Sequence, residues 1–227
     1  MHSFWVENLP EPGIQFQLDK EEETHLFRIL RARPGEQVRV LDGKGGIGIA
    51  EVLPDKILTL LSGKTVEKPA LQLILCCAAP RRQKLDTLFK QAAELGVTEI
   101  HLMHCTRSVA KPEGSSRWPA LLQEACKQSG NPFLPEVCLH DSLTDALAAL
   151  ADANLYFGAV TPPGTPFPTV PAVGRAVFMA GPEGGFTEEE EAEMINAGAQ
   201  GISLGPWILR LETAAVAGLA ALRTAAK

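Results

Sequence analysis

The alternation of apolar runs with helical segments after residue 70 limits the folds open to this chain. Runs with the length and composition of β-strands lie at residues 71–79, 97–105, 136–139, 154–160, 176–180 and 201–204. Most of these runs are followed by a segment that we expect to be helical. Such segments lie near 84–95, near 117–128 and at the C-terminal end, and two more begin at the capping residues Ser142 and Thr187. Strands that alternate with helices form parallel sheets covered on both faces. We therefore expect an α/β fold for this part of the chain.

Residues 1–66 follow a different pattern, in which short apolar runs are broken by turn residues. The sequence DGKGG at 42–46 stands between two alternating runs, which is typical of a β-hairpin. Apolar residues at helical spacing predict one helix at 21–31. The segment 62–70 has little apolar content and contains a proline, as a linker would. The pattern thus predicts a small β barrel at 1–66 and an α/β domain at 70–227.

The formal net charge of −6 argues against nucleic-acid binding by the whole surface, because phosphate affinity normally requires an excess of Lys and Arg. Much of the acid, however, lies in two runs, at 19–23 and 188–191. Basic residues gather elsewhere, at 28–33, 81–84 and 107–111. The sequence is therefore compatible with a local basic face.

No stretch approaches the roughly 18 apolar residues of a membrane helix, and the start lacks a basic region followed by an apolar run. These features predict a cytoplasmic protein with no membrane segment. The five cysteines are an odd number in a chain without a secretion signal, so we expect reduced and mostly buried thiols. His101 and His104 would point to opposite faces of a strand, which disfavours shared ligation, and we expect no metal site.

Two glycine-containing loops are the strongest candidates for a binding site. GPEGGF at 181–186 follows the strand at 176–180, and GPWILRLETA at 205–214 follows the strand at 201–204. Ligands of open α/β sheets bind beyond the carboxyl ends of the strands, where glycines let the backbone approach them closely. Neither loop matches the phosphate-binding GxxxxGK[ST] pattern or the dinucleotide-binding GxGxxG pattern. Taken alone, GPEGG is equally compatible with a simple tight turn.

Motifs in a fixed order make a resemblance to one enzyme family specific. From the N-terminus they are HLFRILRARPGEQVRVLDG at 25–43, KQAAELGV at 90–97, TRSVAK at 106–111, GPEGGFTEEE at 181–190 and LGPWILRLETAA at 204–215. In this order, and over nearly the whole chain, the sequence resembles bacterial small-subunit (16S) ribosomal RNA uracil-N3 methyltransferases, which belong to the SPOUT class. The paired C-terminal motifs are more specific than any single glycine loop.

The resemblance implies a PUA-like, RNA-binding β barrel at 1–66 and a SPOUT methyltransferase domain at 70–227 whose C-terminal chain is threaded into a trefoil knot. Knots are rare, and no periodicity in a sequence predicts one. The resemblance also implies that S-adenosylmethionine is the cofactor and that the enzyme is a homodimer. Its implied substrate is small-subunit ribosomal RNA or the assembled small ribosomal subunit, with neither DNA nor a membrane as a partner.

The same resemblance assigns residues of the two C-terminal motifs to the site. Those implied to bind the cofactor are Gly181, Pro182, Glu183, Gly184, Gly185, Leu204, Gly205, Leu209 and Thr213. Arg210 and Glu212 are implied to be catalytic. A guanidinium suits the charge that develops on the uracil oxygens, and the carboxylate would accept a proton or orient Arg210. Alternatively, Arg210 forms a structural salt bridge and Glu212 stabilises the start of the last helix.

Several basic residues are candidates for contact with RNA phosphates: Arg28, Arg31, Arg33, Arg81, Arg82, Lys84, Arg107 and Lys111. The chain also departs from the family's commonest pattern. Trp207 and Asn131 stand where Arg is usual, Leu211 where Thr is usual, and Gln91 where Lys is usual. These departures remove charges near the expected site, whereas the glycines, Arg210 and Glu212 are retained.

The leading hypothesis is methylation of N3 of a specific uridine that is extruded from its stack, so that its Watson–Crick edge meets the methyl donor. Another SPOUT reaction, methylation of a ribose 2′-hydroxyl, is the nearer alternative. A non-catalytic RNA-binding or ribosome-assembly module is the alternative from another class, and it is favoured if Trp207 and Leu211 have disabled the site.

Overall fold

The computed structural model describes residues 1–159 and 169–226, and the chain divides into two compact units. The N-terminal unit is Met1–Lys68 together with Leu122–Leu134, and the C-terminal unit is Pro69–Leu121 together with the chain from Pro135 onward. The first division lies inside the segment expected as the linker. The sequence pattern predicts two continuous domains, however, whereas the N-terminal unit takes one of its segments from the middle of the chain.

The segment Leu122–Leu134 joins the N-terminal unit through polar contacts that no periodicity indicates. The N–H of Gly45 donates to the carbonyl of Pro132 (2.9 Å). Lys127 Nζ lies 2.6 Å from Glu22 Oε1, with both side chains about nine-tenths buried. Breaking a buried pair of this kind leaves an uncompensated charge, so the contact fixes where the segment lies within its unit.

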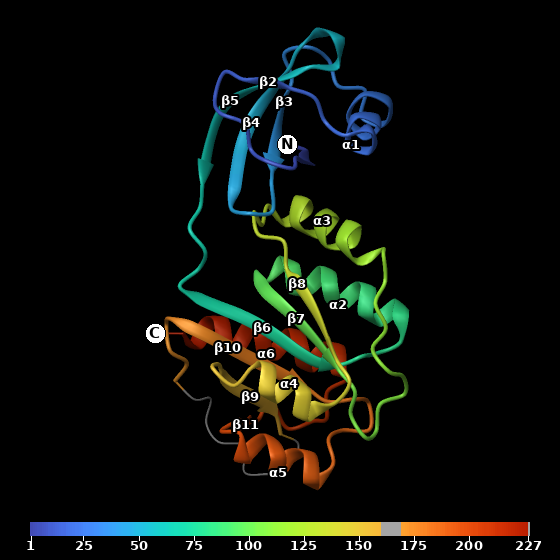
Figure 1. The fold of residues 1–227 in the computed structure, drawn as a ribbon, viewed down its shortest axis with the longest axis vertical. Helices are drawn as coiled ribbons and strands as arrows, with labels where there is room; N and C mark the ends of the chain where they lie inside the picture. Colours follow the sequence, from blue (N-terminus) through green and yellow to red (C-terminus); the bar gives the residue numbers. More distant parts are fainter. Residues whose placement is uncertain (160–168, 227) are drawn as a thin grey trace. The chain divides into compact units, whose positions relative to one another are not determined.

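The N-terminal unit is built on an open, curled sheet in the order β1-β3-β4-β5-β2 (Figure 1). Its strands are β1 (Ser3–Trp5), β2 (Gln15–Phe16), β3 (Gln37–Leu41), β4 (Gly46–Val52) and β5 (Leu58–Thr65), with a short 3-10 turn, η2 (Pro54–Lys56), before β5. β3 and β4 are antiparallel and form the predicted hairpin. Asp42 Oδ1 accepts hydrogen bonds from the N–H groups of Lys44 (2.8 Å) and Gly46 (2.7 Å), which stabilise this turn.

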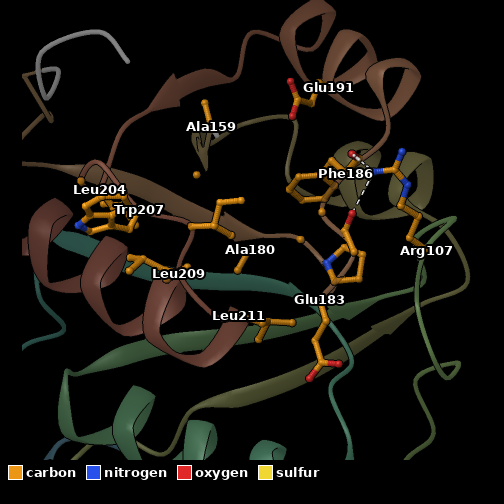
Figure 2. A pocket seen from close by; sticks show the side chains of 18 of the residues that line it. Arg107, Ala159, Ala180, Glu183, Phe186, Glu191, Leu204, Trp207, Leu209 and Leu211 are labelled. Carbon is orange, nitrogen blue, oxygen red and sulfur yellow. Dashed lines mark hydrogen bonds between the residues drawn. The ribbon is translucent and has the colours of Figure 1, made fainter. Parts of the chain in front are cut away.

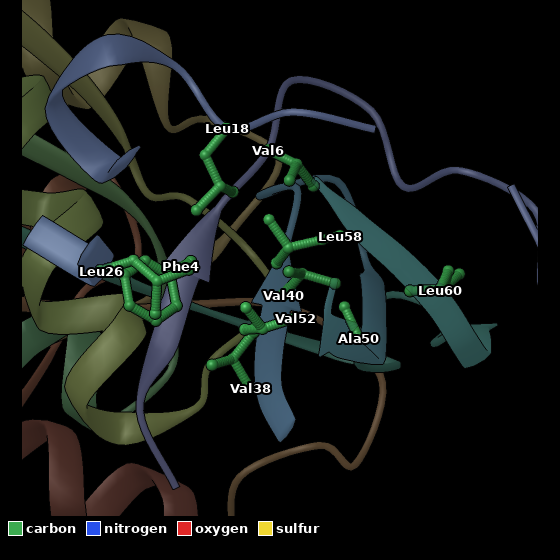
Figure 3. Close-up of a cluster of buried hydrophobic side chains, with 10 residues drawn as sticks. All are labelled: Phe4, Val6, Leu18, Leu26, Val38, Val40, Ala50, Val52, Leu58 and Leu60. Carbon is green, nitrogen blue, oxygen red and sulfur yellow. The ribbon is translucent and has the colours of Figure 1, made fainter. Parts of the chain in front are cut away.

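The helix predicted at 21–31 consists of α1 (Lys20–Thr24) and a π-helical turn, η1 (His25–Ile29). Asp19 caps α1, because its carboxylate accepts hydrogen bonds from two N–H groups of the first turn, each 2.9 Å long. Figure 3 shows the core that the helical segment and the sheet enclose: Phe4, Val6, Leu18, Leu26, Val38, Val40, Ala50, Val52, Leu58 and Leu60. Burial of these side chains is the main stabilising contribution in the small unit.

The C-terminal unit contains an entirely parallel sheet in the order β11-β9-β10-β6-β7-β8. The strands are β6 (Leu71–Ala78), β7 (Val97–Met103), β8 (Glu136–His140), β9 (Asn154–Gly158), β10 (Gly174–Ala180) and β11 (Gln200–Ile202). The central strands are buried at consecutive residues, 73–78 in β6 and 176–180 in β10. Both faces of the sheet are therefore covered, which confirms the α/β prediction.

Three ends of the helices in this half of the chain coincide with signals present in the sequence. They are α2 (Arg82–Glu94), α3 (Trp118–Ser129), α4 (Leu143–Ala149), α5 (Glu188–Asn196) and α6 (Leu211–Ala225). Ser142 caps α4, and Thr187 forms a capping box with Glu190 at the start of α5. Gly96, with a φ of +72°, follows the end of α2. The predicted caps and the predicted stop are confirmed.

Helix α6 packs tightly against the sheet at Gly218. A Cβ atom at this position would lie 2.3 Å from ring carbons of Phe178 in β10, a distance at which one of the two residues must move. α6 also packs against α2 and contacts β6 and β9. Its apolar face, with Ala215, Leu219 and Leu222 fully buried, is therefore used inside the unit.

All five cysteines are free thiols, as expected; four are buried, and Cys138 is partly exposed. Burial raises the pKa of Cys77, Cys105 and Cys126 to about 12, so these thiols stay protonated and unreactive at neutral pH. Among the residues that the structure describes, no helix is long and apolar enough to cross a membrane.

Candidate functional site

A cavity of about 440 Å³ opens beyond the carboxyl ends of β9, β10 and β11, three neighbouring strands of the parallel sheet. Its lining comes from residues 158–159, 180–186 and 204–209, with Arg107, Phe178, Glu191, Leu211 and Ala214. Figure 2 shows side chains from both glycine-containing loops around one shared space. The cavity thus lies where the strand ends predict a ligand site.

Glycine is favoured at several points of the wall, where a side chain would crowd a neighbour or strain the backbone. A Cβ atom on Gly181 would lie 3.0 Å from the ring of Phe186, and one on Gly184 would lie 3.2 Å from Cβ of Arg107. Gly205 adopts a φ of +143°, a conformation that residues with a side chain rarely adopt. At these glycines the two loops bring backbone groups close to the cavity.

Arg107 holds the first loop in place. Its Nη1 atom donates hydrogen bonds to the carbonyl oxygens of Gly184 (2.9 Å) and Phe186 (3.2 Å), drawn as dashed lines in Figure 2. The neighbouring N–H of Thr106 donates to Glu190 Oε1 (2.7 Å), the same carboxylate that completes the capping box of α5. The loop after β7 and the loop after β10 are thereby joined on one side of the cavity.

A cluster of charged side chains surrounds Glu183 of the first loop. Lys84, in the first turn of α2, forms ion pairs with Glu183 and, at 3.5 Å, with Glu212. The hydrogen bond from Lys84 lowers the pKa of Glu183, and the charges of Lys84, Arg81 and Arg210 lower it further. The other oxygen of Glu212, Oε2, is buried and has no hydrogen-bond partner among the described residues.

The remaining wall is largely apolar. The lining includes the buried side chains of Phe178, Phe186 and Leu211. Leu204 and Leu209 line the cavity from the second loop (Figure 2). Apolar walls that carry a few polar groups are typical of small-molecule and cofactor sites. Trp207 and Ile208, at the rim, are also apolar, but their side chains are not buried: they are 81% and 80% exposed.

A family profile described as "RNA methyltransferase domain" matches residues 66–223, and a second, "RNA methyltransferase PUA domain", matches residues 18–60. The chain belongs to the RNA methyltransferase family. A relative named "Ribosomal RNA small subunit methyltransferase E", from Mycobacterium tuberculosis, is 28% identical over 239 residues, covering 96% of this chain and 90% of the relative. The protein of that name from Synechocystis is 30% identical over 209 residues, covering 86% and 68%.

Two solved structures with bound S-adenosyl methionine share the fold. Ribosomal RNA small subunit methyltransferase E from Neisseria gonorrhoeae, bound to S-adenosyl methionine, matches with a TM-score of 0.89 at 29% identity, over 100% of this chain and 98% of that chain. A methyltransferase from Legionella pneumophila, in complex with the cofactor SAM, matches with a TM-score of 0.84 at 25% identity, over 99% and 97%. The family predicted from the motifs and the PUA-like plus α/β fold are confirmed.

Most residues that the sequence assigned to cofactor binding lie together in this methyltransferase. Those that line the cavity are Gly181, Pro182, Glu183, Gly184, Gly185, Leu204, Gly205 and Leu209. Thr213 lies in the first turn of α6 and is not part of the lining. Arg210 and Glu212 are also outside it, although Leu209 and Leu211 on either side of Arg210 are lining residues. The structure pairs Glu212 with Lys84, whereas Arg210 has no ion pair among the described residues.

Motif reasoning did not single out the lining residues Gly158, Ala159, Phe178 and Glu191, nor Arg107 as part of the cavity. Gly158 and Ala159 end a predicted strand adjacent to β10, so the rule about carboxyl ends of strands could have found them. Phe178 and Glu191 carry no such signal, because they enter the cavity from a strand interior and from a helix.

The basic residues expected to contact RNA are divided between the two units of the methyltransferase. Arg28, Arg31 and Arg33 are exposed in the N-terminal unit, inside the matched PUA domain. Arg81 and Lys111 are exposed in the C-terminal unit. Lys84 and Arg107 instead contact residues of the cavity wall. The side chain of Arg82 lies outside the described part of the structure.

His101, which raised the question of a metal, has both ring nitrogens occupied. Nε2 lies 2.9 Å from Glu99 Oε2, and Nδ1 lies 2.8 Å from Nε2 of His140. Glu99 also pairs with Arg175 (2.7 Å), so the buried imidazole belongs to a hydrogen-bonded network on the sheet. Within the described ranges, no group of His, Cys, Asp and Glu side chains is arranged to hold a metal ion.

Proposed function

We propose that this RNA methyltransferase uses S-adenosylmethionine to methylate N3 of a specific uridine in the 16S ribosomal RNA of the small ribosomal subunit, in the cytoplasm. The observation that carries the proposal is the cavity beyond three strand ends, which both C-terminal motifs enclose, with Arg210 and Glu212 beside it at the start of α6. The motifs and the relatives named above support the choice of substrate.

The residues of the cavity fit S-adenosylmethionine. Its volume lies within the range of about 300–1,000 Å³ that is usual for small-ligand sites. Apolar side chains suit an adenine ring, glycine backbone groups offer donors and acceptors, and the carboxylates of Glu183 and Glu191 suit a positively charged ligand. When bound, this cofactor supplies a methyl group on a sulfonium centre. The protein must then hold the target base and manage the proton on N3.

Arg210 and Glu212 are suited to those two tasks. As N3 loses its proton, negative charge spreads onto the flanking carbonyl oxygens of uracil, and a guanidinium stabilises it without giving up a proton. Arg210 is exposed at the N-cap of α6 and is free of ion pairs among the described residues. Glu212 has one oxygen near Lys84 and one that is buried without a partner among the described residues, and we propose that its carboxylate orients Arg210 or accepts the N3 proton.

Contact with the rest of the RNA is assigned to the N-terminal unit and to the exposed arginines and lysines of the C-terminal unit. Three exposed arginines lie within six residues of the chain: Arg28, Arg31 and Arg33. We propose that they bind phosphates and position the RNA, whereas the cavity selects the base. Residues 1–66 would then act as the RNA-holding domain and 70–227 as the methyltransferase domain.

Analysis of ribosomal RNA nucleosides by mass spectrometry tests this function. Small subunits from a strain that lacks the gene should lack one base-methylated uridine and regain it when the gene is restored. A missing 2′-O-methyl nucleoside would favour the ribose reaction instead. Calorimetry with S-adenosylmethionine separates an enzyme from a non-catalytic RNA-binding module, because only the enzyme must bind the methyl donor.

We also propose that the enzyme is a homodimer, as the family resemblance implies. The apolar face of α6 is buried within its own unit and gives no support, but the exposed side chains of Trp207 and Ile208 do. A second copy that covers them would remove apolar surface from water.

Light scattering at micromolar concentration should show a dimer. The double variant Trp207→Ser/Ile208→Ser should shift it toward monomer, and a wild-type protein that is monomeric throughout would contradict this proposal.

A further inference from the structure

Lys84 lies in a part of α2 where the helix itself disfavours a cation. The helix begins at Arg82, so Lys84 lies in its first turn, at the end where the helix dipole stabilises negative charge. The first turn of α2 contains no acidic side chain that would offset this effect. Contacts outside the helix must therefore stabilise the positive charge of the Lys84 ammonium group.

Two carboxylates from distant parts of the chain provide those contacts. Lys84 Nζ hydrogen-bonds Glu183 Oε1 in the loop after β10, and it lies 3.5 Å from Glu212 Oε1 in the first turn of α6. The hydrogen bond with Glu183 raises the pKa of Lys84, and the charge of Glu212 adds to the effect. The same bond lowers the pKa of Glu183. Lys84 and Glu183 are therefore both charged at neutral pH.

Lys84 also joins two walls of one cavity. Loop 181–186 and residues 204–211 enclose the cavity from different sides, and no ion pair joins them directly within the described ranges. Lys84 hydrogen-bonds Glu183 in the first wall and forms an ion pair with Glu212 in α6, the helix that begins where the second wall ends. Because Oε1 of Glu212 faces Lys84, the other oxygen, Oε2, is the one that is buried without a hydrogen-bond partner in the described part of the chain.

We propose that Lys84 is a positioning residue, which holds Glu183 and Glu212 so that the cofactor loop and the start of α6 keep the arrangement needed for methyl transfer. This inference rests on the proposed function and differs from the expectation that Lys84 contacts RNA phosphates. All three side chains are partly exposed, so the ion pairs add little to stability. Their effect is geometric, and a displacement of about 1 Å at a site can slow a reaction by about 100-fold.

The test compares Lys84→Gln, Lys84→Arg and a control, Lys90→Gln, which changes an exposed lysine further along the same helix. Calorimetry measures affinity for S-adenosylmethionine, and single-turnover methylation of small subunits measures the rate.

Lys84→Gln should lose about 10- to 100-fold in rate and several-fold in cofactor affinity, with an unchanged melting temperature. Lys84→Arg should recover most of both, and Lys90→Gln should match the wild type. Glu183→Gln combined with Lys84→Gln should weaken cofactor binding by less than the sum of the two single changes, because the two side chains act together.

The outcomes separate this inference from the function on which it rests. If wild-type protein binds no S-adenosylmethionine, the proposed function fails and the inference fails with it. If wild-type protein is active and Lys84→Gln behaves like Lys90→Gln, only the inference is overturned. A defect confined to RNA affinity, with a smaller dependence on salt, would make Lys84 a phosphate contact and would likewise overturn it.

Discussion

Replacing Arg210 with alanine should slow methyl transfer by about 100-fold or more, with little change in affinity for S-adenosylmethionine. The side chain is outside the cavity lining and has no ion pair among the described residues, so we expect cofactor binding to depend little on it. Its guanidinium is expected to interact with the uracil oxygens only as N3 loses its proton. An interaction made in the transition state alone lowers the barrier to reaction without strengthening ground-state binding.

Single-turnover methylation of purified small subunits, with cofactor affinity measured on the same preparations, checks this expectation. Arg210→Lys should recover only part of the rate, because an ammonium group lacks the planar donors of a guanidinium. Arg223→Ala is a suitable control, since Arg223 lies near the other end of α6 and bonds to the carbonyl of Leu95 (2.7 Å). A near-normal rate for Arg210→Ala would exclude the residue from catalysis, and a loss confined to cofactor affinity would make it a binding residue.

Gly184→Trp should abolish detectable binding of S-adenosylmethionine while the protein stays folded. A Cβ atom at 184 already lies 3.2 Å from Cβ and 3.3 Å from Cδ of Arg107. An indole ring there must displace Arg107, which releases the two hydrogen bonds that hold the loop, and it takes space from a cavity of about 440 Å³. Because the loop lies at the protein surface, the core of the C-terminal unit should be unaffected.

Calorimetry gives the affinity, and circular dichroism with thermal unfolding shows whether the variant is folded. Gly114→Trp is the matched control. It introduces the same side chain at an exposed glycine that does not line the cavity, and the nearest atom to a Cβ there is Leu139 Cδ1 at 3.7 Å. Unchanged cofactor affinity in a folded Gly184→Trp protein would show that this loop is not part of the cofactor site.

The sequence predicted the elements of the C-terminal unit well because their signals are local. Ser142 and Thr187 cap the helices that they were expected to cap, and Gly96 follows the helix that it was expected to end. The motifs likewise predicted most of the cavity, since consecutive residues such as 181–185 follow a strand as one loop. Local patterns are sufficient wherever a site is formed by the chain immediately after a strand.

Features that depend on contacts between distant residues could not be predicted in this way. Nothing near Lys84 in the sequence indicates that Glu183 and Glu212 would be its partners, and it was therefore assigned to RNA. The same limit applies to the segment Leu122–Leu134, which joins the N-terminal unit. The trefoil knot that the family resemblance implies stays a prediction, since neither periodicity nor strand order establishes how a chain is threaded.

The contact between Gly218 and Phe178 has an evolutionary consequence. Helix α6 carries Arg210 at its N-cap and Glu212 in its first turn, and it lies on β10 at a point with no room for a methyl group. If Phe178 keeps its place, a larger residue at 218 pushes the helix outward and moves both side chains, although position 218 lies about two turns away from them. Homologues with a larger residue at 218 should therefore carry a smaller one at 178, so that the two positions vary together across the family although neither carries out chemistry.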